Sequence, residues 1–499
     1  MRNGTRLAAL DLGSNSFRLE IGKYDRGQIH RVEYLKEAVR QGAGLDENNN
    51  LSLEAMQRGW DCLARFSERL AGIRTSQIRA VATQTLREAA NRDVFLSKAH
   101  QILGFPIDVV SGREEARLIY QGVSNLLPRS TDRRLVVDIG GRSTEMILGR
   151  NLEAQQLESF QVGSVTWSIR YFPDGKYTEG AFRKAVIAAR AMLDEAAMTF
   201  RAGKWDVAYG SSGTIGAVTD ILAAGGFPPG MVTMEGLLWL RQRLIKARDL
   251  TSFTIAGLKD ERKPVLAGGL CVLMAVFEVL QIREMAAAQG ALRQGVLYDL
   301  IDREQSTTDL RAESVALLME KFCVDHKQAT RVERTAMSLY RQMPHLDDSV
   351  LAERRERKLR WAARLHEIGA HISHSNYHRH GAYILDHAEA PGFALPELHY
   401  LSLLVLGHRG KLHKLDTDFS DAVFVSLLLS LRLAVIFCHA RRTPVLDDMR
   451  LARRVAPSLG FTLSVSRDWA ASYPQSMYLL RQETEAWDRI GLSFKVVVK

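Results

Sequence analysis

The chain has 499 residues and a formal net charge of +10 at pH 7, with 67 Lys and Arg against 57 Asp and Glu. Its hydrophobic fraction of 46% is enough to bury several cores, which excludes a disordered chain and predicts three or four domains. The positive charge favours acidic partners, but the sequence contains no basic arm or nucleic-acid recognition module, so we expect no nucleic acid among them.

Nothing in the sequence predicts a secretion signal or a membrane span. Residues 1–6 lack the apolar run of a signal peptide. Two apolar stretches, residues 265–280 and 422–438, are short for a span and contain Glu278 and Arg432, respectively, so we expect buried helices. We therefore expect a cytoplasmic protein without integral membrane contact.

In chain order, the first informative element is an acidic turn between two strands. Residues 7–10 predict a short apolar strand, residues 11–16 read DLGSNS, and an alternating strand follows. The same arrangement returns at residues 138–143, which read DIGGRS. Glycines after each Asp allow a tight turn whose backbone N–H groups converge on an anion. Because Asp11 and Asp138 would repel that anion, we expect a divalent cation between them, Mg²⁺ or Mn²⁺.

Two further turns join a strand to a helix. Residues 210–214, which read GSSGT, predict a turn at a helix N-terminus, a ready anion site. In the first half, residues 81–87 have the same order of strand, hydroxyl-rich turn and helix, with Arg87 in place of the glycines. The guanidinium of Arg87 suits bidentate phosphate contact, with a helix-surface charge as the alternative. The expected phosphate-binding residues are Gly13, Ser14, Asn15, Ser16, Gly140, Gly141, Ser143, Thr144, Gly210, Ser211, Ser212, Gly213 and Thr214.

Two adjacent glutamates open the helix that follows the strand at residues 107–110. Side chains of neighbouring helical residues point about 100° apart. Only one of Glu114 and Glu115 can therefore face a cleft, and we expect the other to meet solvent at the helix start. Hydrolysis of a phosphoanhydride needs a base that accepts a proton from the attacking water. Glu145, just after the second acidic turn, is a further candidate, as a metal ligand or as a group that positions the water.

Together these motifs resemble a known family. Two α/β halves with facing phosphate turns are similar to the actin, sugar kinase and heat-shock ATPase superfamily. Residues 111–120, which read SGREEARLIY, narrow the resemblance to the exopolyphosphatase and guanosine pentaphosphate phosphohydrolase family. The resemblance covers nearly the whole chain. It implies an α/β fold with two actin-like (ribonuclease H-like) domains, then a helical HD-like domain and a small α+β module. The expected domains are residues 1–126, 127–305, 306–443 and 444–499.

The resemblance places the general base on Glu115. We expect Arg87 and the turns to stabilise negative charge on the phosphate. The expected catalytic residues are Glu115, Asp138, Glu145 and Arg87, and the expected metal ligands are Asp11, Asp138 and Glu145. The family pattern has three glycines after the second Asp. In this sequence Arg142 stands in place of the third glycine. We expect the Arg142 side chain to point to solvent, with crowding of the turn or a contact along a polyanion as the alternatives.

Beyond residue 308 the sequence has helical periodicity almost throughout. Nine of the 14 histidines lie between His366 and His413. The region resembles the helical HD phosphohydrolase fold, but its signature reads His366–Glu367 and the later ligand Asp is replaced near Leu431. We therefore expect no active second metal site. The expected path for a long polyanion consists of Arg379, His380, Arg409 and Lys411.

The favoured interpretation is a processive, Mg²⁺-dependent exopolyphosphatase that releases orthophosphate from the end of inorganic polyphosphate. The alternative within the family is removal of the 5′ γ-phosphate of guanosine pentaphosphate, which the sequence hardly separates from the first. An interpretation of another class is an actin-like nucleotide-binding sensor without hydrolysis. A sugar or acetate kinase would also need ATP and an acceptor. The family further suggests a homodimer.

Overall fold

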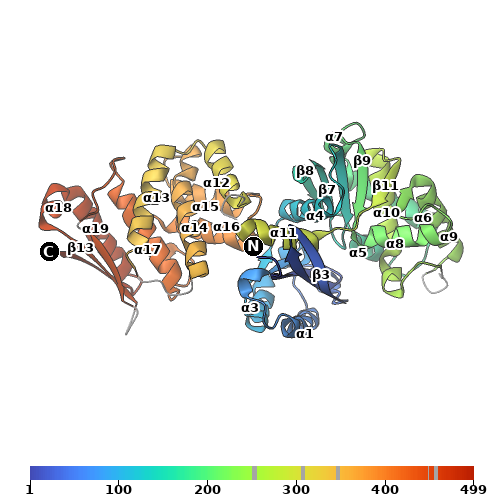
Figure 1. Ribbon diagram of the computed structural model, residues 1–499, viewed down its shortest axis with the longest axis horizontal. Coiled ribbons are helices and arrows are strands. Elements are labelled where there is room, and N and C mark those ends of the chain that lie inside the picture. The colour runs from blue at the N-terminus through green and yellow to red at the C-terminus, as the bar shows by residue number, and fades with distance from the viewer. Residues whose placement is uncertain (250–254, 305–308, 344–348, 448, 455–458) are drawn as a thin grey trace. The chain divides into compact units, whose positions relative to one another are not determined.

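The computed structural model describes residues 1–249, 255–304, 309–343, 349–447, 449–454 and 459–499. The chain divides into two compact units, Met1–Asp309 and Leu310–Lys499 (Figure 1). The polar segment at residues 305–308, which contains a predicted domain boundary, lies outside the described residues. The first unit is α/β and the second is mainly helical with a small sheet, as the sequence predicted.

The first unit begins with a five-stranded mixed sheet. Its order is β3-β2-β1-β4-β5, with β1 antiparallel to β2 and parallel to β4. The strands are β1 (Arg6–Leu12), β2 (Phe17–Asp25), β3 (Gln28–Glu37), β4 (Ile78–Ala82) and β5 (Ile107–Val109). The helices are α1 (Leu53–Arg69), α2 (Gln84–Glu88), α3 (Arg92–Leu103) and α4 (Gly112–Leu126). Strand β1 is buried after its first residue, because it lies at the centre of the sheet.

The second sheet of this unit repeats the first and adds one strand. Its order is β10-β11-β9-β6-β7-β8. The strands are β6 (Arg133–Ile139), β7 (Thr144–Arg150), β8 (Glu153–Phe160), β9 (Val207–Ser211), β10 (Met231–Thr233) and β11 (Glu284–Ala287). Taken from β8, the sequence β8-β7-β6-β9-β11 has the order and the strand directions of β3-β2-β1-β4-β5. The two acidic turns therefore stand at equivalent places in two copies of one supersecondary unit.

Seven helices accompany the second sheet within the described residues. They are α5 (Ser164–Tyr171), α6 (Glu179–Leu193), α7 (Ala196–Phe200), α8 (Ser212–Ala224), α9 (Met234–Ala247), α10 (Lys263–Leu280) and α11 (Leu292–Glu304). One helical stretch of the described chain, Asp260–Leu280, is long and apolar enough to cross a membrane. Within its most apolar window, 72% of the residues are buried inside the protein, which confirms the prediction of a buried helix.

Helices α4 and α11 connect the two copies. Helix α4 follows β5 of the first sheet but packs against β7 and β8 of the second, whereas α11 follows β11 and packs against β1 and β4. The two helices cross closely, because glycines occupy the contact. A β-carbon on Gly295 would lie 1.7 Å from the carbonyl oxygen of Leu118, and one on Gly122 would lie 2.1 Å from that of Ala291. Side chains of both helices and of both sheets then form one continuous hydrophobic cluster.

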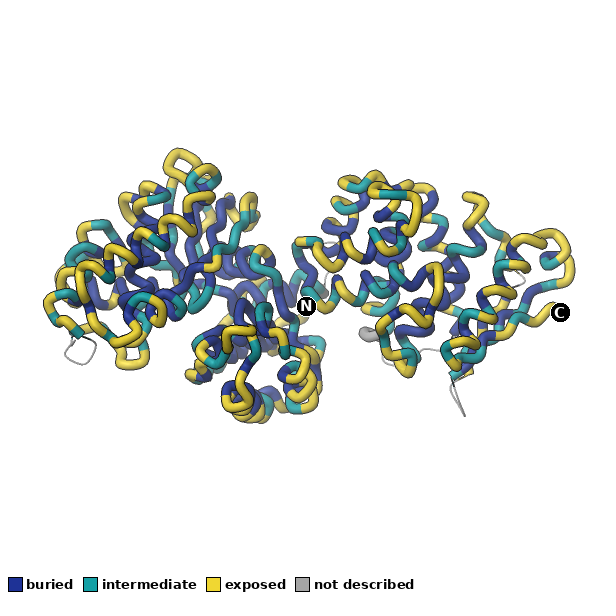
Figure 2. The backbone as a smooth tube through the Cα atoms, turned by 180° about the vertical axis from the view of Figure 1, so that it is seen from behind, coloured by how far each residue is buried: buried dark blue, intermediate teal, exposed yellow. Residues whose placement is uncertain are grey.

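The described residues of the second unit pack around a large hydrophobic core. Its helices are α12 (Leu310–Lys321), α13 (His326–Tyr340), α14 (Ser349–Leu365), α15 (Tyr377–Asp386), α16 (Leu395–Gly407), α17 (Ala422–Phe437), α18 (Arg467–Ser472) and α19 (Pro474–Asp488). Its sheet has the order β12-β13-β14, with β12 (Arg450–Arg454), β13 (Gly460–Val465) and β14 (Ser493–Val498). A cluster of buried side chains runs from Val315 on α12 to Phe494 on β14, and Figure 2 shows in dark blue which parts of the backbone belong to buried residues. The second apolar stretch of the sequence is α17, most of which is buried.

The crossing of α4 and α11 generates a stability prediction. Replacing Gly295 with Ala should lower the free energy of unfolding by about 1–3 kcal/mol, because the new methyl group overlaps backbone atoms that cannot move without separating the helices. The matched control is Gly180→Ala on α6, where a β-carbon meets nothing within 4 Å. There the same change should leave stability unaltered or raise it by about 0.5–1 kcal/mol. Urea denaturation of both variants measures the difference, and equal effects would contradict a tight crossing.

Candidate active site

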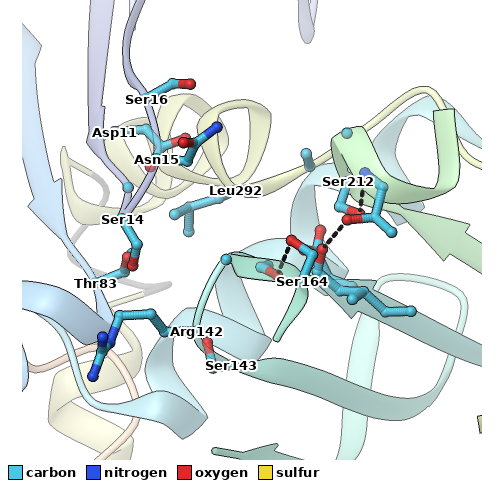
Figure 3. Close-up of a pocket in the computed structure, with 18 of the residues that line it drawn as sticks. Asp11, Ser14, Asn15, Ser16, Thr83, Arg142, Ser143, Ser164, Ser212 and Leu292 are labelled. Atoms are coloured by element: carbon cyan, nitrogen blue, oxygen red, sulfur yellow. Dashed lines mark hydrogen bonds between the residues drawn. The ribbon is translucent and has the colours of Figure 1, made fainter. Parts of the chain in front are cut away.

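A pocket lies in the first unit, where the turns of the two repeated sheets meet. The structure brings together there all four turns that the sequence singled out (Figure 3). Predicted residues that line the pocket are Asp11, Gly13, Ser14, Asn15, Ser16, Glu115, Asp138, Gly140, Gly141, Ser143, Ser212, Gly213 and Thr214. In Figure 3, Ser14 and Thr83 of the first copy lie opposite Arg142 and Ser143 of the second. The pocket is therefore enclosed by hydroxyl groups, glycine turns and carboxylates.

The first acidic turn carries a carboxylate that two arginines compensate. Asp11 is the last residue but one of β1 and pairs in register with Arg18 on β2. Its Oδ2 atom lies 3.5 Å from Nη1 of Arg18 and 3.4 Å from Nη1 of Arg293, which is in the first turn of α11. The Gly42 amide donates to the Ser14 carbonyl over 2.8 Å and fixes the turn from outside.

The second acidic turn carries a carboxylate with weaker compensation. Asp138 pairs in register with Glu145, so that a glutamate occupies the place that Arg18 has in the first copy. Burial raises the pKa of Asp138 to about 6, and the Asp11 charge adds to this, while a Ser211 hydrogen bond and Arg18 oppose it. The turn itself is held from α5, because the Ser164 amide donates to the Gly140 carbonyl over 2.9 Å.

The third turn places a helix N-terminus at the pocket. Ser212 opens α8 with φ +93°, a backbone conformation that favours glycine, so this turn holds local strain. Gly213 lies directly against the Arg262 guanidinium, where a β-carbon would come within 1.8 Å of Nη2. The Thr214 hydroxyl donates to the Ile139 carbonyl over 2.9 Å and ties α8 to the second acidic turn. Gly210 and Ser211 belong to the end of β9, outside the pocket lining.

Glu115 faces the pocket from the first turn of α4. Burial raises its pKa to about 7, and the charges of Asp11 and Asp138 add to this shift, although the Arg87 guanidinium opposes it. Arg87 does not line the pocket. It donates from Nη1 to Glu115 Oε2 over 3.2 Å and to the Val110 carbonyl over 2.7 Å. The structure thus makes Arg87 a partner of Glu115, in place of the direct phosphate contact that we expected.

Glu114, the other member of the pair, is buried as well. It accepts two hydrogen bonds of 2.8 Å from Arg117 and belongs to an ion-pair network with Arg79 and Asp299. The expectation that Glu114 meets solvent was wrong. Its partner Arg117 belongs to the same motif, but Arg79 lies on β4, and Asp299 on α11 shares both arginines, so a motif confined to α4 does not reveal the network.

Glu145 lies behind the pocket. Its Oε1 atom accepts a hydrogen bond of 2.8 Å from the Ser159 hydroxyl. Burial raises its pKa well above the usual value, and the charges of Glu115 and Asp138 add to the shift. Thr144, its neighbour, is buried and donates to the Val162 carbonyl over 2.6 Å, away from the pocket. Three carboxylates, Glu115, Asp138 and Glu145, therefore interact closely enough to hinder one another's ionisation.

The carboxylates fit a cation that is bound partly through substrate. Among the residues that the structure describes, no group of three or more His, Cys, Asp or Glu side chains is placed to hold one ion by itself. Mg²⁺ needs fewer, because it binds one or two carboxylates and completes its shell with phosphate oxygens and water. Asp138 and Glu145 are buried, and their pKa values are raised. A bound cation would favour the ionised form of both side chains, in which their oxygen atoms can act as metal ligands.

Four polar residues at the pocket were not predicted. Arg18, Arg262 and Ser164 line it, and Arg293 reaches Asp11. Arg18 stands at the position where the second copy has Glu145. Aligning the two repeats could therefore have identified Arg18. Arg262 precedes a helix and belongs to no motif. It is held near Gly213 only by the tertiary fold, and burial together with the Arg18 charge lowers its pKa.

Arg142 is the clearest correction at the pocket. We expected it to point to solvent, and it does not. Its Nη2 and Nε atoms lie 2.8 and 3.2 Å from Oε2 of Glu88 on α2, and its Nη1 donates to the Gly42 carbonyl over 3.3 Å. The second turn is thereby tied to the first copy of the repeat.

The predicted polyanion path lies in the second unit. Arg379 and His380 are on α15, and the Arg409 guanidinium stacks 4.7 Å from the Tyr377 ring, so that Arg409 and the nearby Lys411 adjoin that helix. The His366 and His408 rings are buried 5.5 Å apart, and burial lowers both pKa values. Arg432 is buried beside them, with its Nη2 2.7 Å from Glu483 Oε2 and Nη1 donating to the Gly407 carbonyl.

Comparison with known proteins agrees with this architecture. A family model described as the Ppx/GppA phosphatase family matches residues 21–304, and one for domain III of the same family matches residues 310–484. The chain belongs to the Ppx/GppA phosphatase family. It is a hydrolase of phosphoanhydrides, with two actin-like α/β domains and a helical third domain.

Two relatives span almost the whole chain. A protein of Pseudoalteromonas translucida is 38% identical over 98% of both chains, and one of Vibrio cholerae is 39% identical over 97% of this chain and 96% of its own. Both are named guanosine-5′-triphosphate,3′-diphosphate pyrophosphatase. The crystal structure of the Aquifex aeolicus member of this Ppx/GppA family aligns with a TM-score of 0.52 at 22% identity, over 60% of this chain and 99% of that one. That likeness shows the fold.

The raised pKa of Glu115 predicts how stability depends on pH. Below pH 4.5 the group is protonated in both folded and unfolded chains, so it has no effect. As the pH rises towards 7 the unfolded chain ionises more readily, and folding is increasingly disfavoured. Without divalent cations, Glu115→Gln should therefore be more stable than the wild type at pH 8, by up to about 3 kcal/mol, and nearly equally stable at pH 4.

Urea denaturation at the two pH values measures this effect. The control is Glu47→Gln, which changes an exposed glutamate in the same way and should alter stability by less than about 0.5 kcal/mol at both pH values. A Glu115→Gln variant that is less stable than the wild type at pH 8 would contradict the electrostatic description of the pocket.

Proposed function

We propose that this protein hydrolyses the terminal 5′ phosphoanhydride of guanosine 5′-triphosphate 3′-diphosphate. Water adds to the γ-phosphorus while the bond to the β-phosphate oxygen breaks, which yields orthophosphate and guanosine 5′-diphosphate 3′-diphosphate. The observation that carries the proposal is the convergence of two acidic phosphate turns and Glu115 on one pocket. The names of the two full-length relatives support the choice of substrate.

The residues divide the chemical work in a simple way. Glu115 accepts the proton of the attacking water, and a pKa of about 7 suits a base that works near neutral pH. The glycine turns and the N-terminus of α8 bind the phosphate oxygens through backbone N–H groups. Arg18 and Arg262 add positive charge to the pocket wall. Asp138 and Glu145 would hold Mg²⁺ together with phosphate oxygens and water, and the ion when bound would neutralise charge on the phosphates.

A second cavity supports a nucleotide over a plain polymer. It adjoins the phosphate pocket, because both are lined by Gly213 and Arg262. Its wall contains Lys36 and Lys259 together with Asp220 and Glu261, Lys36 pairs with Glu261 over 2.6 Å, and open space lies above Gly216. A nucleoside with a further diphosphate needs such a chamber beside the reacting phosphates, with cations to meet its charge. Linear polyphosphate has no bulky group to fill it.

Exopolyphosphatase activity is the second candidate. It is supported by the net charge of +10 and by the basic residues along α15 and after α16, which suit a long polyanion. Both substrates present a terminal phosphoryl group to the same base, so the pocket alone does not favour either.

The test compares orthophosphate release from guanosine pentaphosphate, long-chain polyphosphate and GTP at equal concentration of terminal phosphate. The proposal predicts the highest kcat/KM for guanosine pentaphosphate, by tenfold or more over GTP, which lacks the 3′-diphosphate. Preference for polyphosphate would establish the second candidate. If none of the three releases orthophosphate, the proposed function is wrong.

Glu115→Gln provides the test of the base. The amide keeps the shape of the side chain but cannot accept the proton, so turnover should fall by about 10²- to 10⁴-fold while the substrate still binds. Single-turnover phosphate release measures the first effect, and equilibrium binding of guanosine pentaphosphate measures the second. Glu47→Gln, on the exposed surface, should behave as the wild type in both. Unimpaired release by Glu115→Gln would remove Glu115 from the mechanism.

Asp138→Asn tests the metal. Hydrolysis should stop when divalent cations are chelated and return with Mg²⁺. The variant should need at least tenfold more Mg²⁺ for half-maximal activity, because it loses one carboxylate ligand. Full activity of the wild type in EDTA, or an unchanged Mg²⁺ requirement in the variant, would exclude this role.

A further inference from the structure

Arg142 is the first member of an unbroken series of hydrogen bonds that ends on Glu115. Arg142 donates to Oε2 of Glu88 over 2.8 and 3.2 Å. The other oxygen of Glu88 accepts from the Gln84 amide, and the Gln84 carbonyl oxygen accepts from Nη2 of Arg87. Arg87 then donates from Nη1 to Glu115 over 3.2 Å. The series starts at Arg142, which lines the pocket, passes through Glu88, Gln84 and Arg87, which do not line it, and ends on the base.

The donors and acceptors can be arranged in only one direction. Both arginines only donate and Glu88 only accepts, so the Gln84 amide must turn its NH₂ group to Glu88 and its oxygen to Arg87. Gln84 and Glu88 are four residues apart on α2 and lie on one face of it. Gln84 is almost fully buried, so its amide has few alternative partners. Each member of the series therefore fixes the orientation of the next.

The charge of Arg142 has a specific use in this arrangement. Glu88 is an anion near Arg87, separated from it by the Gln84 side chain. While Arg142 pairs with Glu88, Arg87 remains paired with Glu115. Without Arg142, Arg87 is the guanidinium nearest to Glu88 within the series, and it would be drawn away from Glu115. The base would then be protonated to a higher pH, because its stabilising cation would be shared.

We propose that Arg142 is a positioning residue that, by neutralising Glu88, keeps the Arg87 guanidinium hydrogen-bonded to Glu115. The proposal rests on the proposed function only in requiring hydrolysis with Glu115 as the base, whichever of the candidate substrates is used. It also explains why an arginine is tolerated in a glycine turn, since its guanidinium leaves the turn for α2.

The experiment measures kcat and KM between pH 5.5 and 9.5 for Arg142→Gly, Glu88→Gln and the double variant. Arg142→Gly should move the acid limb of kcat/KM upward by about one pH unit, so that kcat/KM falls about tenfold at pH 6.5 and recovers to within about twofold at pH 9. KM should stay nearly constant. The double variant should return towards the wild-type profile, because the anion that competes for Arg87 is gone. Arg142→Lys should lie between the wild type and Arg142→Gly, since it keeps the charge.

The alternatives give different results. If Arg142 instead binds the substrate, Arg142→Gly raises KM at every pH, leaves the acid limb in place and is not rescued by Glu88→Gln, and the proposal is overturned. An unchanged profile in a folded variant overturns it too. Arg129→Gly, which removes an exposed arginine after α4, is the control and should match the wild type. Failure of the wild type to hydrolyse any of the three substrates would instead count against the proposed function.

Discussion

The close crossing of α4 and α11 is the constraint on which the pocket depends. Each helix starts from one copy of the repeat and packs on the other, and glycines at the contact let the two backbones approach to a distance that no side chain permits. The first turn of α4 carries Glu115, and the first turn of α11 carries Arg293, which reaches Asp11. One packing contact therefore sets the positions of a base and of a charge partner that are far apart in the chain.

Near this helix crossing, several carboxylates of like charge lie close together. Asp11 has two arginines beside it, whereas Asp138 and Glu145 are supported mainly by serine hydroxyl groups. The resulting rise in the pKa values of these carboxylates lowers the stability of the protein when no ligand is bound. It also favours the binding of a cation and a proton by the carboxylates. A site of this kind is organised for a ligand that brings positive charge together with phosphate.

The sequence predicted the parts of the site that are local. Both acidic turns, the turn at α8 and the orientation of one glutamate towards the pocket depend on residues within a few positions of each other, and the structure contains them. The pairing of Glu114 with Arg79 and of Arg142 with Glu88 could not be predicted, because the partners are distant in sequence. Arg262 was missed for the same reason. Arg18 could have been inferred from the strand register, had the repeats been aligned through their second strands.

The pairing of Asp11 with Arg18 and of Asp138 with Glu145 also has a consequence for the ligand's orientation. Two identical halves would form a pocket with no preferred end, in which a chain of phosphates could lie either way round. An arginine at one of the two equivalent positions and a glutamate at the other give the cavity a positive side and a negative side. For the function proposed above, the negative remainder of the substrate would be attracted to the side of Arg18 and Arg262, with its last phosphoryl group near the acidic side and Glu115. The difference between the two copies of this strand thus makes the two ends of the pocket electrostatically different.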